Sequence, residues 1–173
     1  MTLHVYQRGH FPRETLATLW GYVEHDKAAP KLFYAQPLQD TPVSTVGDLA
    51  AFVGYFEDPK RHLLLVEGDD GQVMGMVWFD DVLPGHRAAV NAFYRRRYWG
   101  AKTRVATREA LRLAFGSLQV QSIWAYTPWP EAVSHALACG MKPHAMLRDF
   151  ALVHGQLRDL TILRIDKGDL IDG

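Results

Sequence analysis

Basic side chains gather in one short stretch of an otherwise neutral chain. Between 95 and 108 there are six of them: Arg95, Arg96, Arg97, Lys102, Arg104 and Arg108. The stretch joins a strand-like run at 86–95, through a Trp-Gly turn, to an amphipathic helix expected from 101 to 115. The first N–H groups of a helix have no intrahelical acceptor, so this junction can hold a phosphate. A solvated strand end and helix face explain the cluster equally well, and nucleic-acid binding ranks third.

Few other side chains suit proton transfer. Asp80 and Asp81 follow a strand at a turn, where an exposed structural pair is the favoured interpretation, although a carboxylate there could position an amine. Asn91 in the next strand is open to both interpretations. His135 and His144 are the titratable candidates by position, while Cys139 precedes a helix-ending glycine and is expected to be buried and inert. No ligand pattern for a metal is found.

Composition indicates one ordinary globular domain, taken as 1–173. The chain has 173 residues, is 48% hydrophobic, and balances 19 basic against 19 acidic side chains, so no general attraction to nucleic acid or anionic membrane is expected. A single cysteine excludes an internal disulfide framework. Without an apolar run near the ~20 residues of a membrane span, we expect a soluble, cytoplasmic protein.

Hydrophobic periodicity and turn residues predict an α/β (α+β) fold in the order β-α-α-β-β-β-α-β-α-β-β. Strands are expected over 3–6, 62–66, 72–79, 86–95, 120–126, 146–153 and 156–165. Helices are expected over 13–23, from Ser44 or Thr45 to 56, over 101–115 with Gly116 as its cap, and over 131–138. An ordered, proline-rich loop is expected over 25–43. A helix between two strands in the middle of the chain predicts a mixed, mostly antiparallel central sheet flanked by helices.

This order, together with several short sequences, resembles the GNAT superfamily of acyl-CoA-dependent N-acyltransferases. The likeness is clearest to the branch that acetylates the N-termini of ribosomal proteins. The sequences that carry it are Tyr98-Trp99-Gly100, Ala106-Thr107-Arg108-Glu109-Ala110-Leu111, Ser122-Ile123-Trp124-Ala125, His135-Ala136-Leu137-Ala138-Cys139-Gly140-Met141 and the terminal hairpin around His154-Gly155. The resemblance covers the core, 62–165, while the helical and loop portion, 1–61, matches in outline.

The resemblance implies that acetyl-CoA is the acyl donor and enters between two splayed strands, with its pyrophosphate on the following helix. Arg97 and Gly100 match the family's phosphate loop, and Lys102 stands where the family has a second small residue. The implied cofactor-binding residues are Arg97, Tyr98, Trp99, Gly100, Ala101, Lys102, Thr103, Arg104, Tyr126 and Trp129.

The implied chemistry needs a group that protonates the departing thiolate. Counting back from Gly140, the family's tyrosine aligns with Ala136, and its Asn and Ser positions hold Trp129 and Ala132. The neighbouring His135 and Ser134 are the expected substitutes, with Asp80 as a further candidate catalytic residue.

Two functions therefore stay open. The first, slightly favoured, is transfer of an acetyl group to a primary amine, on a protein N-terminus or a small molecule, by direct attack in a ternary complex. The alternative is a GNAT-fold protein used without catalysis for binding or assembly, for example in a viral particle, or in nucleic-acid modification. The oligomeric state stays open as well.

Overall fold

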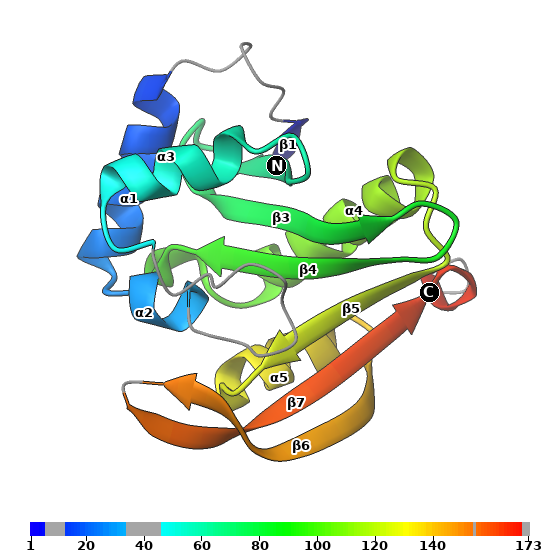
Figure 1. Cartoon of the computed structure of the whole chain (residues 1–173). Helices are drawn as coiled ribbons and strands as arrows, with labels where there is room; N and C mark the ends of the chain where they lie inside the picture. The colour runs from blue at the N-terminus through cyan, green and yellow to red at the C-terminus, as the bar shows by residue number, and fades with distance from the viewer. Residues whose placement is uncertain (6–12, 34–45, 154, 171–173) are drawn as a thin grey trace.

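The computed structural model describes residues 1–5, 13–33, 46–153 and 155–170, and within them seven strands form one sheet (Figure 1). The sheet order is β1-β2-β3-β4-β5-β7-β6. The strands are β1 (Thr2–Val5), β2 (His62–Glu67), β3 (Val73–Leu83), β4 (Arg87–Tyr94), β5 (Ser122–Thr127), β6 (Lys142–Val153) and β7 (Gln156–Asp166). Only the β4–β5 pair is parallel. The predicted mixed, mostly antiparallel sheet is confirmed.

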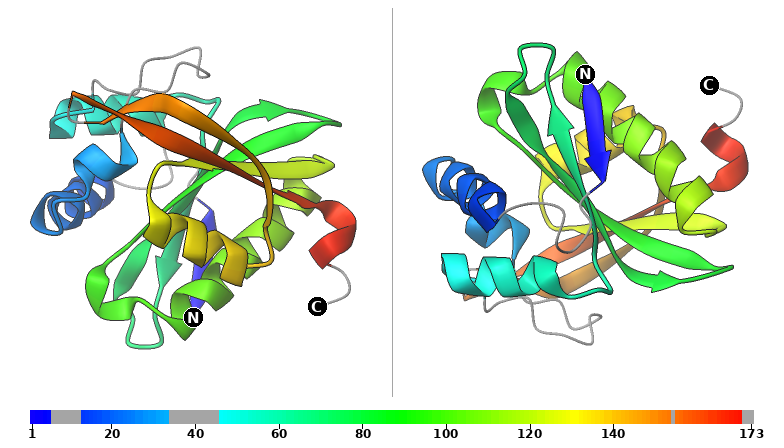
Figure 2. Two further views of the ribbon diagram at one scale, coloured as in Figure 1. Left: turned by 90° about the horizontal axis from the view of Figure 1, so that it is seen from below. Right: turned by 90° about the horizontal axis from the view of Figure 1, so that it is seen from above.

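Helices cover both faces of the sheet. They are α1 (Arg13–His25), α2 (Ala29–Leu32), α3 (Leu49–Glu57), α4 (Ala101–Ser117) and α5 (Pro130–Ala138). Figure 2 shows α1 and α3 on one side of the strands, with α4 and α5 on the other. The central strands therefore need apolar side chains on both faces, which explains continuous apolar runs such as Leu63–Val66 in β2.

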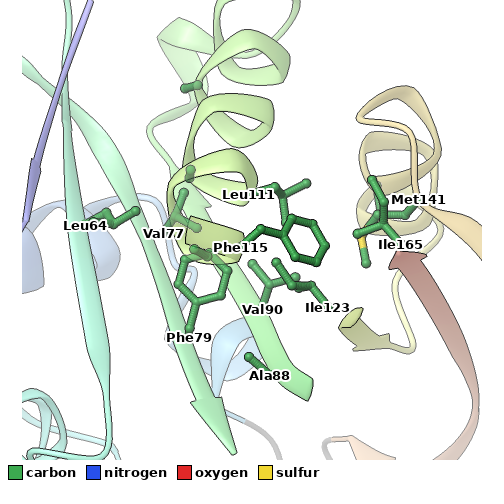
Figure 3. Packing of buried hydrophobic residues seen from close by; sticks show 14 of the residues in the cluster. Leu64, Val77, Phe79, Ala88, Val90, Leu111, Phe115, Ile123, Met141 and Ile165 are labelled. Atoms are coloured by element: carbon green, nitrogen blue, oxygen red, sulfur yellow. The ribbon is translucent and has the colours of Figure 1, made fainter. Parts of the chain in front are cut away.

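The core beneath α4 is aliphatic with few aromatic rings. Leu111 and Phe115 of α4 pack against Val77 and Phe79 of β3 and Val90 of β4, as Figure 3 shows. These side chains are 0–9% exposed. At about 25 cal/mol for each Å² of buried apolar area, such packing holds α4 firmly against the strands.

The core on the other face is aromatic. Phe52 and Phe56 of α3 pack edge to face at 4.9 Å, and Phe56 meets Trp78 of β3 at 5.5 Å. Phe33, which follows α2, stacks on Trp78 at 6.0 Å, and Trp20 of α1 lies 5.3 Å from Phe52. This cluster attaches the N-terminal helices to the sheet.

The structure differs from the sequence-based expectations at several boundaries, one of which is the start of β6 at Lys142 instead of 146. Residues 29–32 form the one-turn helix α2 within the expected loop, since proline is tolerated in a first helical turn. Asp48 caps α3 by accepting from Ala51 N at 2.8 Å, while 34–45, with Ser44 and Thr45, lies outside the described residues. Gly116 lies inside α4, which extends to Ser117. Finally, β3 continues past the predicted end to Leu83 through an irregularity in its pairing with β4.

Candidate functional site

The parallel strands β4 and β5 pair over only three residues each. Arg87–Ala89 lies beside Ser122–Trp124, and beyond these residues the two strands separate (Figure 1). Both stay ordered, because β4 keeps its pairing with β3 to Tyr94 and β5 keeps its pairing with β7 to Thr127. Parted strands present backbone N–H and C=O groups to the gap, and these need partners. The gap can therefore accept an extended ligand that carries amide groups.

A pocket of about 1270 Å³ occupies this gap. It exceeds the roughly 300–1,000 Å³ that small-molecule sites usually have. Its walls come from α1, α2, β4, the start of α4, β5 and α5. The pocket therefore joins the separated strands to the beginning of a helix in one continuous space, long enough for an extended ligand.

Most of the residues predicted from sequence line this pocket. The predicted cofactor-binding residues that line it are Arg97, Trp99, Gly100, Thr103, Arg104, Tyr126 and Trp129. Those that do not are Tyr98, Ala101 and Lys102. Of the predicted catalytic residues, Ser134 and His135 line the pocket, and Asp80 does not.

The first turn of α4 presents backbone donors at the pocket. Gly100 precedes the helix with φ 126° and ψ −137°, a conformation that only glycine adopts readily. The N–H of Arg104 donates to Gly100 O at 3.2 Å, so the amides of 101–103 precede the first intrahelical bond. Thr103, almost fully buried, accepts from Gly100 N at 3.3 Å and fixes this turn. Open amides and the helix dipole together favour an anion here.

The basic cluster divides into structural and available side chains. Arg95 stacks on the ring of Tyr22 at 3.7 Å and donates to a β3 carbonyl at 2.9 Å. Arg108 donates to the carbonyl at the end of α5 at 2.8 Å. Lys102 reaches Asp69 at 3.6 Å, so its long side chain leaves the helix start clear. The substitution of a small residue by Lys102 therefore does not obstruct the anion seat.

Arg97 and Arg104 line the pocket, and Arg95 and Arg96 are the other cations of the cluster that do so. Arg97 donates to Tyr98 Oη at 2.6 Å, and Tyr98 in turn donates to Asp70 at 2.9 Å. Next to them the indole of Trp99 is 57% exposed, although its Nε1 is held by the last carbonyl of β4 at 2.7 Å. A fixed, exposed aromatic face beside two arginines suits an aromatic, phosphorylated ligand.

A polar chain runs beneath the pocket from β4 to α5. Tyr94 Oη lies 2.9 Å from Thr107 Oγ1, which lies 2.9 Å from His135 Nε2. Burial lowers the pKa of His135, with a smaller effect from Arg104 nearby. Burial also raises the pKa of Tyr94. Both groups are therefore neutral at neutral pH.

We assign the direction of this chain from the supply of hydrogen-bond donors, since the distances alone are compatible with either His135 tautomer. If the buried Tyr94 phenol donates to Thr107, the Thr107 hydroxyl is free to donate to His135 Nε2. If Thr107 instead donated to Tyr94 Oη, the buried phenol proton of Tyr94 would lose Thr107 Oγ1 as its acceptor. His135 Nε2 is then the acceptor and Nδ1 carries the proton, which makes this imidazole a hydrogen-bond donor through Nδ1.

Cys139 lies one turn beyond His135 in the same region. Its Sγ is 3.6 Å from His135 Nε2, but the residue is fully buried and burial raises the pKa of its thiol. Because the thiolate is the nucleophilic form, Cys139 is not a competent nucleophile. It is buried, as expected from the sequence.

The α5 wall has small side chains, among them Ala136, the position that the sequence resemblance aligns with a GNAT tyrosine. Ala132 and Ala136 both line the pocket, and Ala136 is 8% exposed. Trp129 precedes α5, donates through Nε1 to the Lys31 carbonyl at 3.1 Å, and lies 5.0 Å below the Lys31 ammonium. Lys31 also pairs with Glu131 at 2.7 Å. These contacts close the pocket between α2 and α5.

Asp80 is buried instead of exposed at a turn, because β3 continues beyond it. It is 7% exposed, and its Oδ2 accepts from Tyr55 Oη at 2.9 Å and Asn91 Nδ2 at 3.2 Å. Trp78 Nε1 donates to the same Tyr55 oxygen at 3.2 Å. Burial is the main reason why the pKa of Asp80 rises to about 6, and the Asp81 charge adds to the rise. The preferred sequence interpretation of an exposed pair was wrong for Asp80 and correct for Asp81.

Three polar residues of these networks were missed from the sequence. Tyr55 and Tyr94 lie in apolar runs and resemble core residues, so only the strand pairing reveals their polar partners. The sequence does contain a pattern that indicates Thr107. It lies four residues after Thr103, so the two threonines form a polar stripe on the buried face of α4.

The described ranges contain neither a group of metal ligands nor a membrane-spanning helix. No three His, Cys, Asp or Glu side chains there lie close enough to hold a metal ion. None of the helices among those residues combines the length and apolar character needed to cross a membrane.

Comparison with known proteins finds similarity at the level of structure. No protein-family model matches the chain, and neither does any curated protein. Spermidine N-acetyltransferase SpeG from Vibrio cholerae, in a single-substitution variant, matches with a TM-score of 0.75 and 17% identity over 99% of this chain and 98% of that one. The same enzyme in complex with CoA and spermine matches with a TM-score of 0.71 and 16% identity, covering 98% and 97%.

A chimera of SpeG with hSSAT also matches, with a TM-score of 0.76 and 16% identity over 99% of each chain. The matches extend over the N-terminal helices as well as over the core that carries the sequence resemblance. The chain therefore has the GNAT-like fold of these N-acetyltransferases.

Proposed function

We propose that this protein transfers an acetyl group from acetyl-CoA to a primary amine by direct attack within a ternary complex. The observation that carries the proposal is one pocket that joins the parted β4 and β5 to the open first turn of α4. CoA has the matching chemistry: an extended pantetheine with two amides, followed by a pyrophosphate. The similarity in fold between this protein and an enzyme solved with CoA and spermine supports the same assignment.

In this proposal the cofactor lies along the gap with its pyrophosphate on the amides of 101–103. Those amides and the helix dipole bind the phosphates without a metal. Arg97 and Arg104 line the pocket beside them and supply charge-assisted hydrogen bonds. The exposed indole of Trp99 gives the adenine a flat surface to stack on.

The reaction requires a neutral amine and a stabilised leaving group. The amine nitrogen forms a bond to the thioester carbonyl carbon, the carbon–sulfur bond breaks, and the proton lost by nitrogen ends on sulfur to give CoA thiol. Neutral His135 suits hydrogen-bond donation from Nδ1 to the departing sulfur, with Tyr94 and Thr107 orienting the ring. The Ser134 hydroxyl, exposed on the same wall, is the second candidate donor.

The charges of the pocket favour an acceptor with one amine. Its described lining includes six Lys and Arg side chains, Lys27, Lys31, Arg95, Arg96, Arg97 and Arg104, against the carboxylates of Asp26 and Glu131. Both carboxylates are engaged, Asp26 by the Arg96 N–H at 3.0 Å and Glu131 by Lys31. A polycation would meet net repulsion. We therefore favour a small monoamine or, in line with the Tyr98-Trp99-Gly100 resemblance, a protein N-terminus.

A second candidate function is binding of acyl-CoA without transfer. Ala136 favours it, because this position lines the pocket and offers no proton where the family has a tyrosine. Turnover separates the two candidates: release of CoA thiol that depends on an added amine eliminates the second.

Calorimetric titration of CoA tests the first step of both candidates. We expect saturable binding, weakened about tenfold or more in the double variant Arg97→Ala/Arg104→Ala, because two charge-assisted phosphate contacts are lost. Arg148→Ala removes an exposed cation from β6, away from the pocket, and should leave the affinity unchanged. Absence of binding at millimolar CoA refutes both candidates.

A further inference from the structure

The aromatic face of the sheet contains a carboxylate with one unused oxygen. Asp80 is only 7% exposed, and it is hydrogen-bonded to Tyr55, whose ring packs against Phe56. Its Oδ2 accepts two hydrogen bonds, and its Oδ1 has no partner among the described residues. Burying an ionisable group in apolar surroundings is costly for the fold. Such a group is expected where function requires it.

Asp80 determines which way the Asn91 amide faces. An ionised carboxylate only accepts hydrogen bonds, so the Asn91 group that lies 3.2 Å from Asp80 Oδ2 must be the Nδ2 amino group. The side-chain carbonyl Oδ1 is then turned away from Asp80. Tyr55 holds the carboxylate in place from α3 at 2.9 Å.

Asn91 lies where an acceptor substrate must approach the cofactor. It is two residues past Ala89, the last residue of β4 that pairs with β5, and it lines the pocket. Strand alternation directs its side chain to the face that carries α1 and α3, opposite to Val90 and Tyr94, which pack beneath α4. A substrate on that face reaches the gap from the side opposite α4.

Resting on the proposed function, we infer that Asn91 binds the acceptor amine, with its carbonyl Oδ1 accepting a hydrogen bond from the attacking nitrogen. Asp80 and Tyr55 are positioning residues, which keep that oxygen turned toward the pocket. An oriented carbonyl favours an amine that carries an N–H group over a tertiary amine, because such a nitrogen keeps a proton to donate while its lone pair points at the thioester.

The sequence allows a direct test, because Asn91 is the only asparagine in the chain. Protein labelled with ¹⁵N-asparagine gives a single side-chain NH₂ group in an NMR spectrum. In the CoA-saturated wild type at pH 8, n-butylammonium chloride is the probe. We expect saturable shifts of this NH₂ group. In the Asp80→Ala variant, which adds no second asparagine, we expect a different starting position, because the carboxylate partner is lost.

Calorimetry with the same probe measures the energetic role of the contact. We expect Asn91→Leu, which keeps the approximate volume and removes the acceptor, to weaken n-butylammonium about tenfold or more while CoA binds as before. Asp80→Asn should weaken the probe by a smaller factor, because an amide at 80 allows the Asn91 amide to turn over. Gln121→Leu, an exposed substitution outside the pocket, is the matched control and should change neither affinity.

The outcomes separate the inference from the proposed function. If the CoA-loaded wild type fails to bind the probe, or if Asn91→Leu binds it with unchanged affinity, Asn91 is not the amine ligand. Failure of CoA itself to bind refutes the proposed function instead. Thermal unfolding of each variant shows whether a loss of binding comes from misfolding. Asn91→Ser retains a small acceptor and should partly restore binding, so it keeps the test valid if Asn91→Leu does not fold.

Discussion

Replacing Asp80 with asparagine is expected to make the protein more stable at neutral pH, although it damages the amine site. Burial raises the pKa of this carboxyl from its ordinary 3.8 to about 6 in the folded state. A raised folded-state pKa means that the folded protein prefers the protonated acid. The wild type is therefore relatively most stable below about pH 4 and loses this advantage as the pH rises through 6.

The size of the effect follows from the two pKa values. A change from 3.8 to about 6 corresponds to about 3 kcal/mol, since each tenfold change in acidity is worth about 1.4 kcal/mol. Asparagine has nearly the same shape and does not ionise. It can still accept from Tyr55 and Asn91 through one oxygen, so any loss or gain of hydrogen bonding adds a constant that does not vary with pH.

Urea unfolding at pH 4, 5, 6, 7 and 8 measures the quantity directly. The free energy of unfolding of Asp80→Asn minus that of the wild type should grow by about 2.5 kcal/mol between pH 4 and pH 8, because the remainder of the total of about 3 kcal/mol develops below pH 4. Asp81→Asn removes the exposed neighbouring carboxylate and should shift stability by less than about 0.5 kcal/mol. A difference for Asp80→Asn that is flat across this range would show that Asp80 is not desolvated, contrary to its 7% exposure.

Three further expectations address packing, chemistry and substrate. Gly75→Ala should destabilise the fold by about 2 kcal/mol or more in urea unfolding, because the added Cβ would lie 2.1 Å from Phe93 O. Gly116→Ala adds a Cβ in open space on α4 and should stabilise the fold by about 0.5–1 kcal/mol. Thr107→Val should lower kcat with little change in KM for acetyl-CoA. ¹⁵N NMR should show an unprotonated His135 Nε2 in the wild type but not in this variant. A protonated Nε2 in the wild type would reverse the assigned direction of the hydrogen bonds from Tyr94 to His135. In a thiol-release assay n-butylamine should exceed spermidine in kcat/KM by about tenfold or more, and a preference for spermidine would contradict the charge argument.

Much of the fold could be predicted from the sequence, because its signals are local. The hairpin of β2 and β3 follows from two apolar runs around the turn 68–71, where Gly71 adopts φ 70°. The start of α4 follows from Trp99-Gly100, because glycine alone suits the conformation before the helix. Likewise, Arg97 and Gly100 match the phosphate loop of the superfamily that the sequence resembles, and both line the pocket.

The rest of the site depends on contacts between distant residues. Thr107 and His135 are 28 positions apart, and nothing near either residue indicates their hydrogen bond. Tyr55 meets Asp80 only because α3 packs across β3, and the extension of β3 beyond Phe79 is what buries the carboxylate. The structural role of Lys102 also escaped the sequence, because its partner Asp69 belongs to another turn.

A single strand connects the two halves of the proposed chemistry. Because side chains alternate along β4, Asn91 points to the α1 and α3 face, where Asp80 holds it, and Tyr94 points beneath α4, where Thr107 and His135 continue the chain. The acceptor amine and the departing sulfur need different polar groups on opposite sides of one thioester. The residues of β4 that part from β5 can supply both at a separation fixed by three strand positions. A one-residue insertion between Asn91 and Tyr94 would turn both groups to the same face, so it should abolish acetyl transfer while CoA still binds at the start of α4.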